Sequence, residues 1–416
     1  MFKSALLLFQ EGDVSLARAA VVMLMSLTES SANRSRVVKL ERLVMGVCEM
    51  IESKAAPQYR IAGSVLSRLA ETTSEGARSQ LVSLEAVRSA VLCLLRDDSF
   101  QGRVTGAKIV VNISDDVSSL ERLGCHDGIV GAVAEMIIGT GRSAEEAVQG
   151  AQAVRVLASL GQEMVARISN LKGVVHRLVR LLKGGGEDFV ERNDDQAEDG
   201  QSTNDEGHSV DEHKKVNADG AHLDGLEEGE AAEEGEPMKL EECVAIGLGA
   251  LHEISCCEEG CVSISREDGH MKTLVWYANG GCGGEAAEIS LSIVRRLVDR
   301  IVDSRHVFLH TEGALNVLVK SVKEGSSKQV GDAISIIRRL GMARGELKEK
   351  VALHEEICDT LVSFADDRHL HFNNSVLFPS PLTHASPLAR LSSPISHLPS
   401  PISNLPSLAA LVICCV

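Results

Sequence analysis

The chain has 416 residues, of which 44% are hydrophobic but only 3% are aromatic, and its formal net charge at pH 7 is -17. So few aromatic side chains argue against an aromatic-rich β-sandwich and against an RNA-binding module that stacks bases on aromatic rings. Residues 187–236 contain 19 acidic and 3 basic side chains, so this segment has a net charge of -16. The rest of the chain is therefore close to neutral.

The first residues of the chain look like the second half of a repeat unit. The run FKSALLLFQ is apolar and is followed by Glu-Gly-Asp, so we expect residues 1–12 to form a partial N-terminal repeat. The run is too short for a secretory signal, and no stretch reaches the roughly 18 apolar residues that a membrane span needs. Eleven cysteines, mostly inside apolar helical patterns, fit a reducing compartment. We therefore expect a soluble protein of the cytoplasm, with the nucleus as the alternative.

Two kinds of helix alternate from residue 13 onward. One kind is rich in small residues, as in LARAAVVMLMSLTE from Leu16, and we call it the small-residue helix. The other kind has apolar residues at spacings of three and four, as in GVVHRLVRLLKGGG from Gly173, and we call it the packing helix. Equivalent apolar positions of the packing helices, here called anchors, are Leu43, Val87, Ile129, Val175, Met271, Leu315 and Ile357.

The spacing of the anchors predicts the architecture. The steps between them are about 44, 42, 46, 96, 44 and 42 residues, and a period in the low forties is typical of armadillo or HEAT repeats. The single long step is one period plus an insertion of roughly fifty residues. We predict about four repeats in residues 13–186 and about three in residues 237–368.

The residues within the repeats resemble the armadillo repeat, with HEAT repeats as the alternative. The closest matches are GRVTGAKIVVNIS with Asn112 and EGALNVLVKSVKEGS with Gly313 and Ala314. The resemblance implies an all-α fold, an α-α superhelix of the armadillo-repeat solenoid type. Residues 187–236 are acidic and almost free of aromatic side chains, and residues 369–416 repeat Ser-Pro and Leu-Pro. We therefore expect a disordered acidic insertion and a disordered C-terminal tail.

A longer stretch is similar to the armadillo region of plant U-box ubiquitin ligases. It runs from Ile61 to Ser114 and continues in AVRVLASLGQEMVARISNLKGVVHRLVRLL. In that family the U-box docks the ubiquitin-conjugating enzyme, and the armadillo repeats select the substrate. The resemblance implies that this chain is a protein–protein interaction module, the substrate-recognition part of such a ligase, and not an enzyme by itself because the U-box is missing. The alternative is a non-catalytic scaffold or adaptor unrelated to ubiquitin transfer.

The sequence contains no motif of a known reaction. Nucleophile-elbow, P-loop, zinc-protease and kinase spacings are missing, so we expect no catalytic residue and no cofactor. Four possible zinc ligands, one histidine and three cysteines, lie close in sequence, and a fourth cysteine follows later. They lack paired CxxC spacing, and we expect no metal site. These residues are His252, Cys256, Cys257, Cys261 and Cys282.

The predicted partner-binding surface lies on the packing helices. The armadillo resemblance implies that these helices line a concave groove, where positions one and five residues after each anchor share one face. These positions form a basic row with the only Trp of the chain: Arg88, His176, Arg180, Lys272, Trp276, Asn316 and Lys320. We expect the row to bind a protein partner or ubiquitination substrate, and no nucleic acid, with Trp276 as the apolar anchor. The alternative is that basic side chains only solvate an exposed helix face.

The acidic insertion is a second candidate ligand for this row. It is tethered between the fourth and fifth full units, which gives it a high effective concentration near the basic side chains. We therefore expect an intramolecular contact in which the insertion competes with acidic partners.

Overall fold

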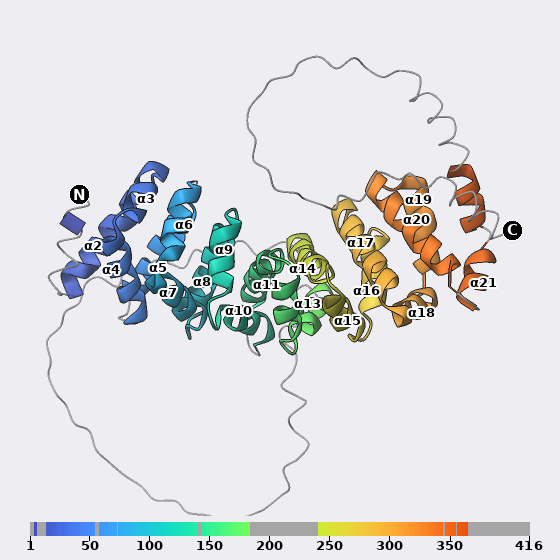
Figure 1. Cartoon of the computed structure of the whole chain (residues 1–416), viewed down its shortest axis with the longest axis horizontal. Coiled ribbons are helices and arrows are strands. Elements are labelled where there is room, and N and C mark those ends of the chain that lie inside the picture. The colour runs from blue at the N-terminus through green and yellow to red at the C-terminus, as the bar shows by residue number, and fades with distance from the viewer. Residues whose placement is uncertain are drawn as a thin grey trace, which may run out of the picture.

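The computed structural model describes residues 4–5, 14–54, 58–72, 74–139, 143–183, 240–343, 346–354 and 356–364. Within these ranges the chain forms helices and turns and no strand, and the helices stack into one elongated array (Figure 1). The predicted disorder of residues 187–236 and 369–416 lies outside the described residues. The contact expected of the acidic insertion also lies outside the described residues, as does most of the partial repeat predicted at residues 1–12.

Each unit consists of a small-residue helix, a short helix and a packing helix, in this order. The small-residue helices are α2 (Val14–Leu27), α5 (Gln58–Ala70), α8 (Phe100–Ile113), α11 (Ala144–Ala158), α14 (Leu240–Ile254), α17 (Gly284–Arg300) and α20 (Ser327–Gly341). The short helices are α3 (Ser31–Val38), α6 (Glu75–Ser83), α9 (Val117–Gly124), α12 (Gln162–Ser169), α15 (Glu258–Ser265), α18 (Val302–His310) and α21 (Glu346–Ala352). The packing helices are α4 (Glu41–Glu52), α7 (Glu85–Leu95), α10 (Ile129–Ile138), α13 (Val174–Lys183), α16 (His270–Ala278), α19 (Ala314–Glu324) and a last helix at 356–364.

The repeating triplet confirms the predicted all-α armadillo-repeat solenoid. Six of the seven anchors are buried, and Leu315 is partly buried against the same core. The short helix between the two longer ones is a feature that the sequence analysis did not resolve. In the described part of the chain, no helix is long and apolar enough to cross a membrane.

One buried position of the small-residue helices carries a small side chain in every unit from α5 to α20. The residues at this position are Ala62, Gly106, Gly150, Gly247, Ser290 and Ala333. A Cβ atom added at Gly106 would lie 2.9 Å from the backbone nitrogen of Leu95, and one at Gly150 would lie 2.9 Å from Cγ1 of Ile137. The small side chain therefore lets each helix approach the preceding packing helix closely.

Helices of the same kind in neighbouring units pack on one another along the array. Small-residue helices of neighbouring units approach one another closely along the array, whereas the packing helices approach one another less closely from α7 onward. Figure 1 shows α11 and α14 side by side near the middle of the array, with α10 and α13 below them in this view. Whether the packing helices line a concave groove, as the resemblance implies, stays a prediction.

Arginine side chains connect consecutive units at the carboxyl ends of helices. Nη1 of Arg68 donates to the carbonyl oxygen of Met25 at 3.0 Å, one unit earlier. Nη1 of Arg296 donates to the carbonyl oxygen of His252 at 2.5 Å. A cation is favourable there because the last carbonyl groups of a helix lack intrahelical partners and carry partial negative charge. These contacts between units add to the apolar core between them.

The stack continues across the acidic insertion. Helices α13 and α14 pack against each other, and α11 and α14 pack as closely as the small-residue helices of uninterrupted units. The hydroxyl of Tyr277 on α16 donates to the carbonyl oxygen of Leu182 on α13 at 2.5 Å. The units on the two sides of residues 184–239 are therefore joined by direct contacts.

Candidate functional site

The predicted basic row lies on the outward faces of the packing helices. Six of its seven residues are exposed on three consecutive packing helices, α13, α16 and α19: His176, Arg180, Lys272, Trp276, Asn316 and Lys320. Because α13 contacts α16 and α16 contacts α19, the six side chains share one surface, here called the outer row. Whether a partner binds there stays a prediction.

Arg88 does not belong to the outer row. It lies on α7, and the equivalent positions of the intervening α10 are occupied by Val130 and Ala134, which are 5% and 2% exposed. Nη1 of Arg88 donates to the carbonyl oxygen of Val82 at 2.7 Å, at the end of α6. Its hydrogen bond to Glu85 lowers the pKa of that carboxyl. Arg88 therefore has a local structural role that its sequence position did not reveal.

His176 is used in a contact between units. Its Nδ1 lies 2.7 Å from Oε2 of Glu267, in the turn between α15 and α16. Nζ of the nearby Lys183 donates to the carbonyl oxygen of Asp268 at 2.9 Å in the same turn. These two side chains hold α13 to the next unit, whereas Arg180 and Lys272 are exposed on the surface.

Trp276 is the most distinctive residue of the outer row. Its side chain is 56% exposed, although Trp is the largest apolar side chain. Its ring meets the ring of Tyr277 edge to face, with centroids 4.7 Å apart and an interplanar angle of 79°. A Cβ atom added at Gly281 would lie 2.5 Å from Cε3 of the indole, so the ring lies directly over the Gly281 backbone. Trp276 is thus held on a rigid base with part of its surface open to solvent.

A cavity of about 260 Å³, lined in part by Lys320 of the outer row, lies between the α16–α17 loop and the α19–α20 loop. Glycines form much of its wall, and two of them, Gly280 and Gly283, have φ angles of 97° and 92° that favour glycine. Nζ of Lys320 donates to the carbonyl oxygen of Asn279 at 2.9 Å and so reaches across from α19. The sequence analysis missed this cavity; the run Asn-Gly-Gly-Cys-Gly-Gly at 279–284 was the available signal.

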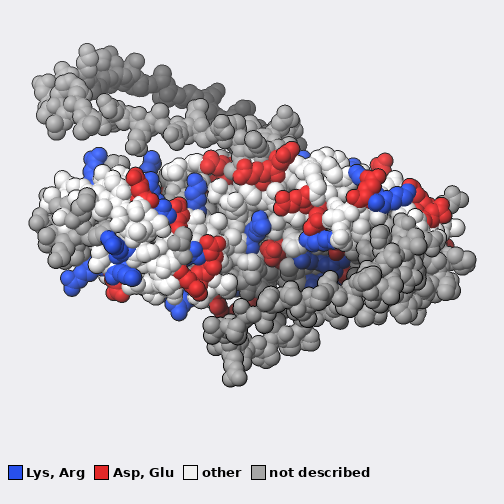
Figure 2. All heavy atoms as spheres, turned by 90° about the horizontal axis from the view of Figure 1, so that it is seen from above, with Lys and Arg blue, Asp and Glu red and all other residues white. Residues whose placement is uncertain are grey.

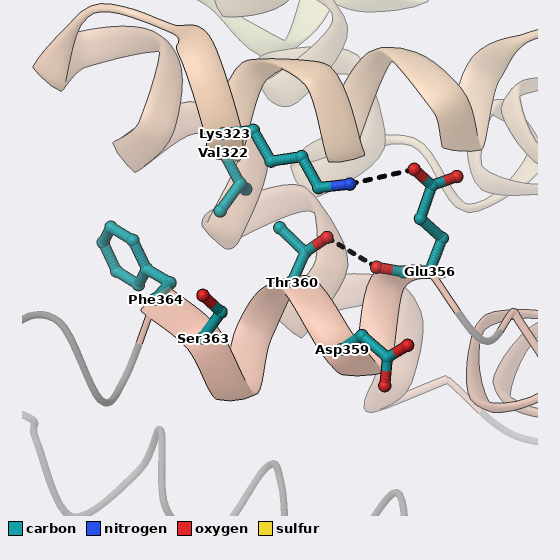
Figure 3. A pocket seen from close by; sticks show the side chains of 7 residues that line it. All are labelled: Val322, Lys323, Glu356, Asp359, Thr360, Ser363 and Phe364. Atoms are coloured by element: carbon teal, nitrogen blue, oxygen red, sulfur yellow. Dashed lines mark hydrogen bonds and ion pairs between the residues drawn. The ribbon is translucent and has the colours of Figure 1, made fainter.

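A second cavity, of about 380 Å³, lies between α19 and the helix at 356–364 (Figure 3). Lys323 and Glu356 point toward each other across it, with Nζ and Oε1 2.9 Å apart. The hydroxyl of Thr360 donates to the carbonyl oxygen of Glu356 at 2.6 Å. Because its lysine is already paired with a carboxylate, this cavity offers less attraction to an anion than the first.

Charge is mixed on the face of the array that Figure 2 draws. On the face seen from above in Figure 2, basic and acidic side chains are interspersed along the array. Such a face produces no extended field of one sign that would attract a charged partner. The outer row with its cavity is therefore the more specific candidate.

The thiols weighed as zinc ligands are engaged in hydrogen bonds. Sγ of Cys261 donates to the carbonyl oxygen of Ser255 at 3.2 Å, and Sγ of Cys257 accepts from the backbone N–H of Gly260 at 3.3 Å. Burial raises the pKa of both thiols, which favours the protonated form that does not bind metal. Among the residues that the structure describes, no three His, Cys, Asp or Glu side chains gather as a metal site would require.

The chain is similar to several solved structures in the arrangement of its backbone. No protein-family model and no curated protein matches the chain. A designed armadillo repeat protein matches with a TM-score of 0.49 and 14% identity over 71% of this chain and 99% of its own. A second designed armadillo repeat protein, in complex with the peptide (KR)4, matches with a TM-score of 0.46 and 14% identity over 71% and 98%. An engineered protein matches with a TM-score of 0.46 and 16% identity over 74% and 97%.

Proposed function

We propose that this chain is a polypeptide-binding module that holds its partner on the outer row. The observation that carries the proposal is the exposed indole of Trp276 on a rigid helix, with Lys272 one turn away and Lys320 on the next packing helix. Tryptophan is enriched among the few residues that supply most of the binding energy of protein interfaces. The surrounding lysines favour an acidic partner over a basic one.

The outer row suits an extended polypeptide better than a compact small molecule. Its members come from three units in succession, so a ligand must span several helices to contact them all. Successive units of a repeat array present similar positions at regular intervals, which matches the regular spacing of side chains along an extended chain.

We further propose that the module is the substrate-recognition part of a U-box type ubiquitin ligase. The support is the sequence resemblance that begins at Ile61, together with the repeat period. This proposal assigns substrate binding to the repeats and assigns the docking of the ubiquitin-conjugating enzyme to a U-box. No residue of the described array is given a catalytic role.

Binding is tested by selecting peptides from a displayed random library on the immobilised full chain. Because Trp276 is the only tryptophan, its fluorescence reports directly on occupation of the outer row. We expect selected peptides to shift this emission in the wild type. By titration calorimetry they should bind the Trp276→Ala variant at least about ten-fold more weakly, as for an interface hot spot. The matched control is Val302→Ala, at a 58% exposed position on α18. Equal binding to both variants and the wild type would refute the proposed surface.

The ligase role needs a separate experiment. A U-box fused ahead of Met1 is assayed with ubiquitin, activating enzyme and a panel of conjugating enzymes, with a selected peptide attached to a carrier protein as the substrate. We expect ubiquitin transfer to the carrier by the fusion and loss of this transfer in its Trp276→Ala form, while self-modification persists in both. A carrier that is bound but stays unmodified would leave the binding module intact and reject the ligase role.

A further inference from the structure

The line of the outer row continues on the last packing helix, at residues 356–364. The position five residues after the anchor is occupied there by Val362, which is 46% exposed. The corresponding residues on the three preceding packing helices are all exposed and are Arg180, Trp276 and Lys320. In the first three units this position is buried or partly buried and is occupied by Cys48, Leu92 and Ala134. An exposed side chain at this position is therefore a property of the last four units.

The last packing helix is joined directly to α19. Nζ of Lys323 lies 2.9 Å from Oε1 of Glu356, across the cavity that Figure 3 shows. Among residues 356–364, the exposed ones are Glu356, Asp359, Val362 and Ser363, and none of these is basic. The positive charge along the row therefore ends at α19, and Val362 is the apolar exposed residue of the last helix.

Trp276 and Val362 are the two large apolar side chains that are exposed at this position of the repeat. They are 56% and 46% exposed, and they lie two units apart with Lys320 of α19 between them. A single exposed apolar side chain is common on protein surfaces and needs no partner. These two differ from isolated residues because equivalent positions of stacked units face the same side of the array, so one ligand can contact both.

The separation of the two helices sets the spacing that such a ligand needs. Packed helices lie about 8–10 Å apart, so two steps along the array, from α16 to the last helix, amount to roughly 20 Å. An extended polypeptide advances about 3.3 Å per residue, and side chains an even number of residues apart point to the same face. Two apolar side chains about six residues apart would therefore reach Trp276 and Val362 together.

Lys320 favours an acidic residue between these two side chains. It lies on α19, between the helices of Trp276 and Val362, and its ammonium group uses one of three donors on the carbonyl oxygen of Asn279, at 2.9 Å. The ammonium group can therefore donate to a further acceptor. A carboxylate near the middle of the bound segment would lie over this helix.

We propose that Trp276 and Val362 are the two apolar contacts of one site, which binds an extended polypeptide with two apolar side chains about six residues apart and an acidic residue between them. This inference rests on the proposed polypeptide-binding function and narrows its ligand class. Trp276 contacts one apolar side chain, Val362 contacts the other, and Lys320 contacts the acidic residue. Val362 thus determines which spacing is bound.

The test uses synthetic peptides with two leucines at different separations, joined by a spacer of Ser and Gly with one Glu at its middle. Affinity for the full chain is measured by titration calorimetry, and Trp276 emission reports occupation of the site in the wild type. We expect the tightest binding when the leucines stand about six residues apart. This peptide should bind at least about ten-fold more tightly than one with the leucines two residues apart.

Variants of the chain test the contact with each leucine. Val362→Glu should weaken binding of the best peptide about ten-fold, and Val362→Thr, which keeps the shape of the side chain, should weaken it less. Replacement of one leucine by serine should abolish the effect of Val362→Glu and leave that of Trp276→Ala, and replacement of the other leucine should do the reverse.

The matched control is Val307→Glu, at a 45% exposed valine on α18 outside the row. It should leave the affinity unchanged. Thermal unfolding of both valine variants should coincide with that of the wild type, because both positions are exposed.

The outcomes separate the two proposals. If peptides bind in a Trp276-dependent manner but equally at every separation of the leucines, or if Val362→Glu has no effect, the second contact is overturned and the polypeptide-binding function stands. Tightest binding with the leucines two residues apart would place the second contact on a neighbouring unit and overturn the role of Val362. If no peptide binds, the two-contact site is overturned together with the proposed function.

Discussion

Arg103 of α8 and Glu146 of α11 form a buried ion pair between two consecutive units. Nη2 of Arg103 lies 2.9 Å from Oε2 of Glu146, and Nε donates to the other carboxylate oxygen, so the pair is bidentate. Their side chains are 9% and 1% exposed. Nη1 of Arg103 also donates to the carbonyl oxygen of Asp97 at 2.7 Å. The guanidinium group of α8 therefore connects the chain segment after α7 to the first turn of α11.

Removal of one partner should be costly, because it leaves a charge buried without compensation. We expect Glu146→Ala to lower the free energy of unfolding of the units around α8 and α11 by about 3–5 kcal/mol. The combination of Glu146→Leu with Arg103→Met should cost clearly less than the sum of the single changes. Urea unfolding combined with amide hydrogen exchange of α8 and α11 measures both quantities.

The matched control is the pair of Arg78 with Asp115, in which the carboxylate is 77% exposed. Asp115→Ala should change stability by less than about 1 kcal/mol, since exposed pairs are screened by solvent. Additive effects of the two buried substitutions would contradict the pairing of Arg103 with Glu146.

Gly106 on α8 should not tolerate an added methyl group. An added Cβ would lie 2.9 Å from a backbone atom, the nitrogen of Leu95, which cannot move aside as a flexible side chain can. We expect Gly106→Ala to destabilise by about 1–3 kcal/mol, in spite of the higher helix propensity of alanine. Gly131→Ala on α10 is the control: nothing lies within 4 Å of its added Cβ, so it should stabilise by up to about 1 kcal/mol. Thermal melts of the two variants should move in opposite directions.

Tyr277 should contribute through its hydroxyl as well as its ring. Tyr277→Phe keeps the ring but leaves the carbonyl oxygen of Leu182 without this donor. We expect a loss of about 1–2 kcal/mol, because an intramolecular hydrogen bond is removed and a buried acceptor is left unpaired. Burial raises the pKa of Tyr277 to about 12, so the hydroxyl stays protonated in spectrophotometric titration until the protein unfolds. Ionisation near the ordinary value of about 10 in the folded protein would show that the hydroxyl is not buried as described.

Stability should fall on mild acidification because of His270. This residue is 4% exposed; its Nδ1 faces the carbonyl oxygen of Glu267, and its Nε2 has no partner in the described part of the chain. Burial lowers the pKa of His270 below its ordinary value of about 6.5, so the unfolded chain takes up the proton more readily. The stabilising effect of the neutral ring is therefore present above about pH 6.5 and is lost as the pH falls below it.

The measurement is the midpoint of urea unfolding between pH 7.5 and 5.5, where carboxyl groups with lowered pKa values remain ionised. His270→Gln should flatten this dependence. As a control, replacement of the exposed His306 by Gln removes a histidine without removing a buried neutral ring. Parallel pH profiles of the wild type and His270→Gln would exclude the proposed role.

The repeat architecture was predictable from the sequence because it depends on local patterns. Apolar residues spaced by three and four predict each packing helix, and their recurrence at about 43 residues predicts the stack, as the buried anchors confirm. The close approach between units was not predictable in the same way. It depends on contacts between helices, since a Cβ atom added at Gly106 or Gly150 would lie 2.9 Å from an atom of the preceding packing helix.

The candidate site was predictable only in part. Exposure of Trp276 and Lys320 follows from their places on the polar side of amphipathic helices. Arg88 was misassigned because a long side chain can reach the end of the neighbouring short helix, which the spacing within its own helix does not show. The cavity was missed because it forms where the loops containing Gly280 and Gly325 meet, more than forty residues apart in sequence.

The direct contact of α13 with α14 means that the covalent connection between them is dispensable for their association. Two separate polypeptides, one ending at residue 183 and one beginning at residue 240, should recombine into a single particle when they are co-expressed. Their affinity then measures the coupling between adjacent units, which an intact chain does not reveal. Joined to the two halves of a reporter enzyme, such fragments form a split sensor in which Tyr277→Phe should weaken complementation through the lost bond to Leu182.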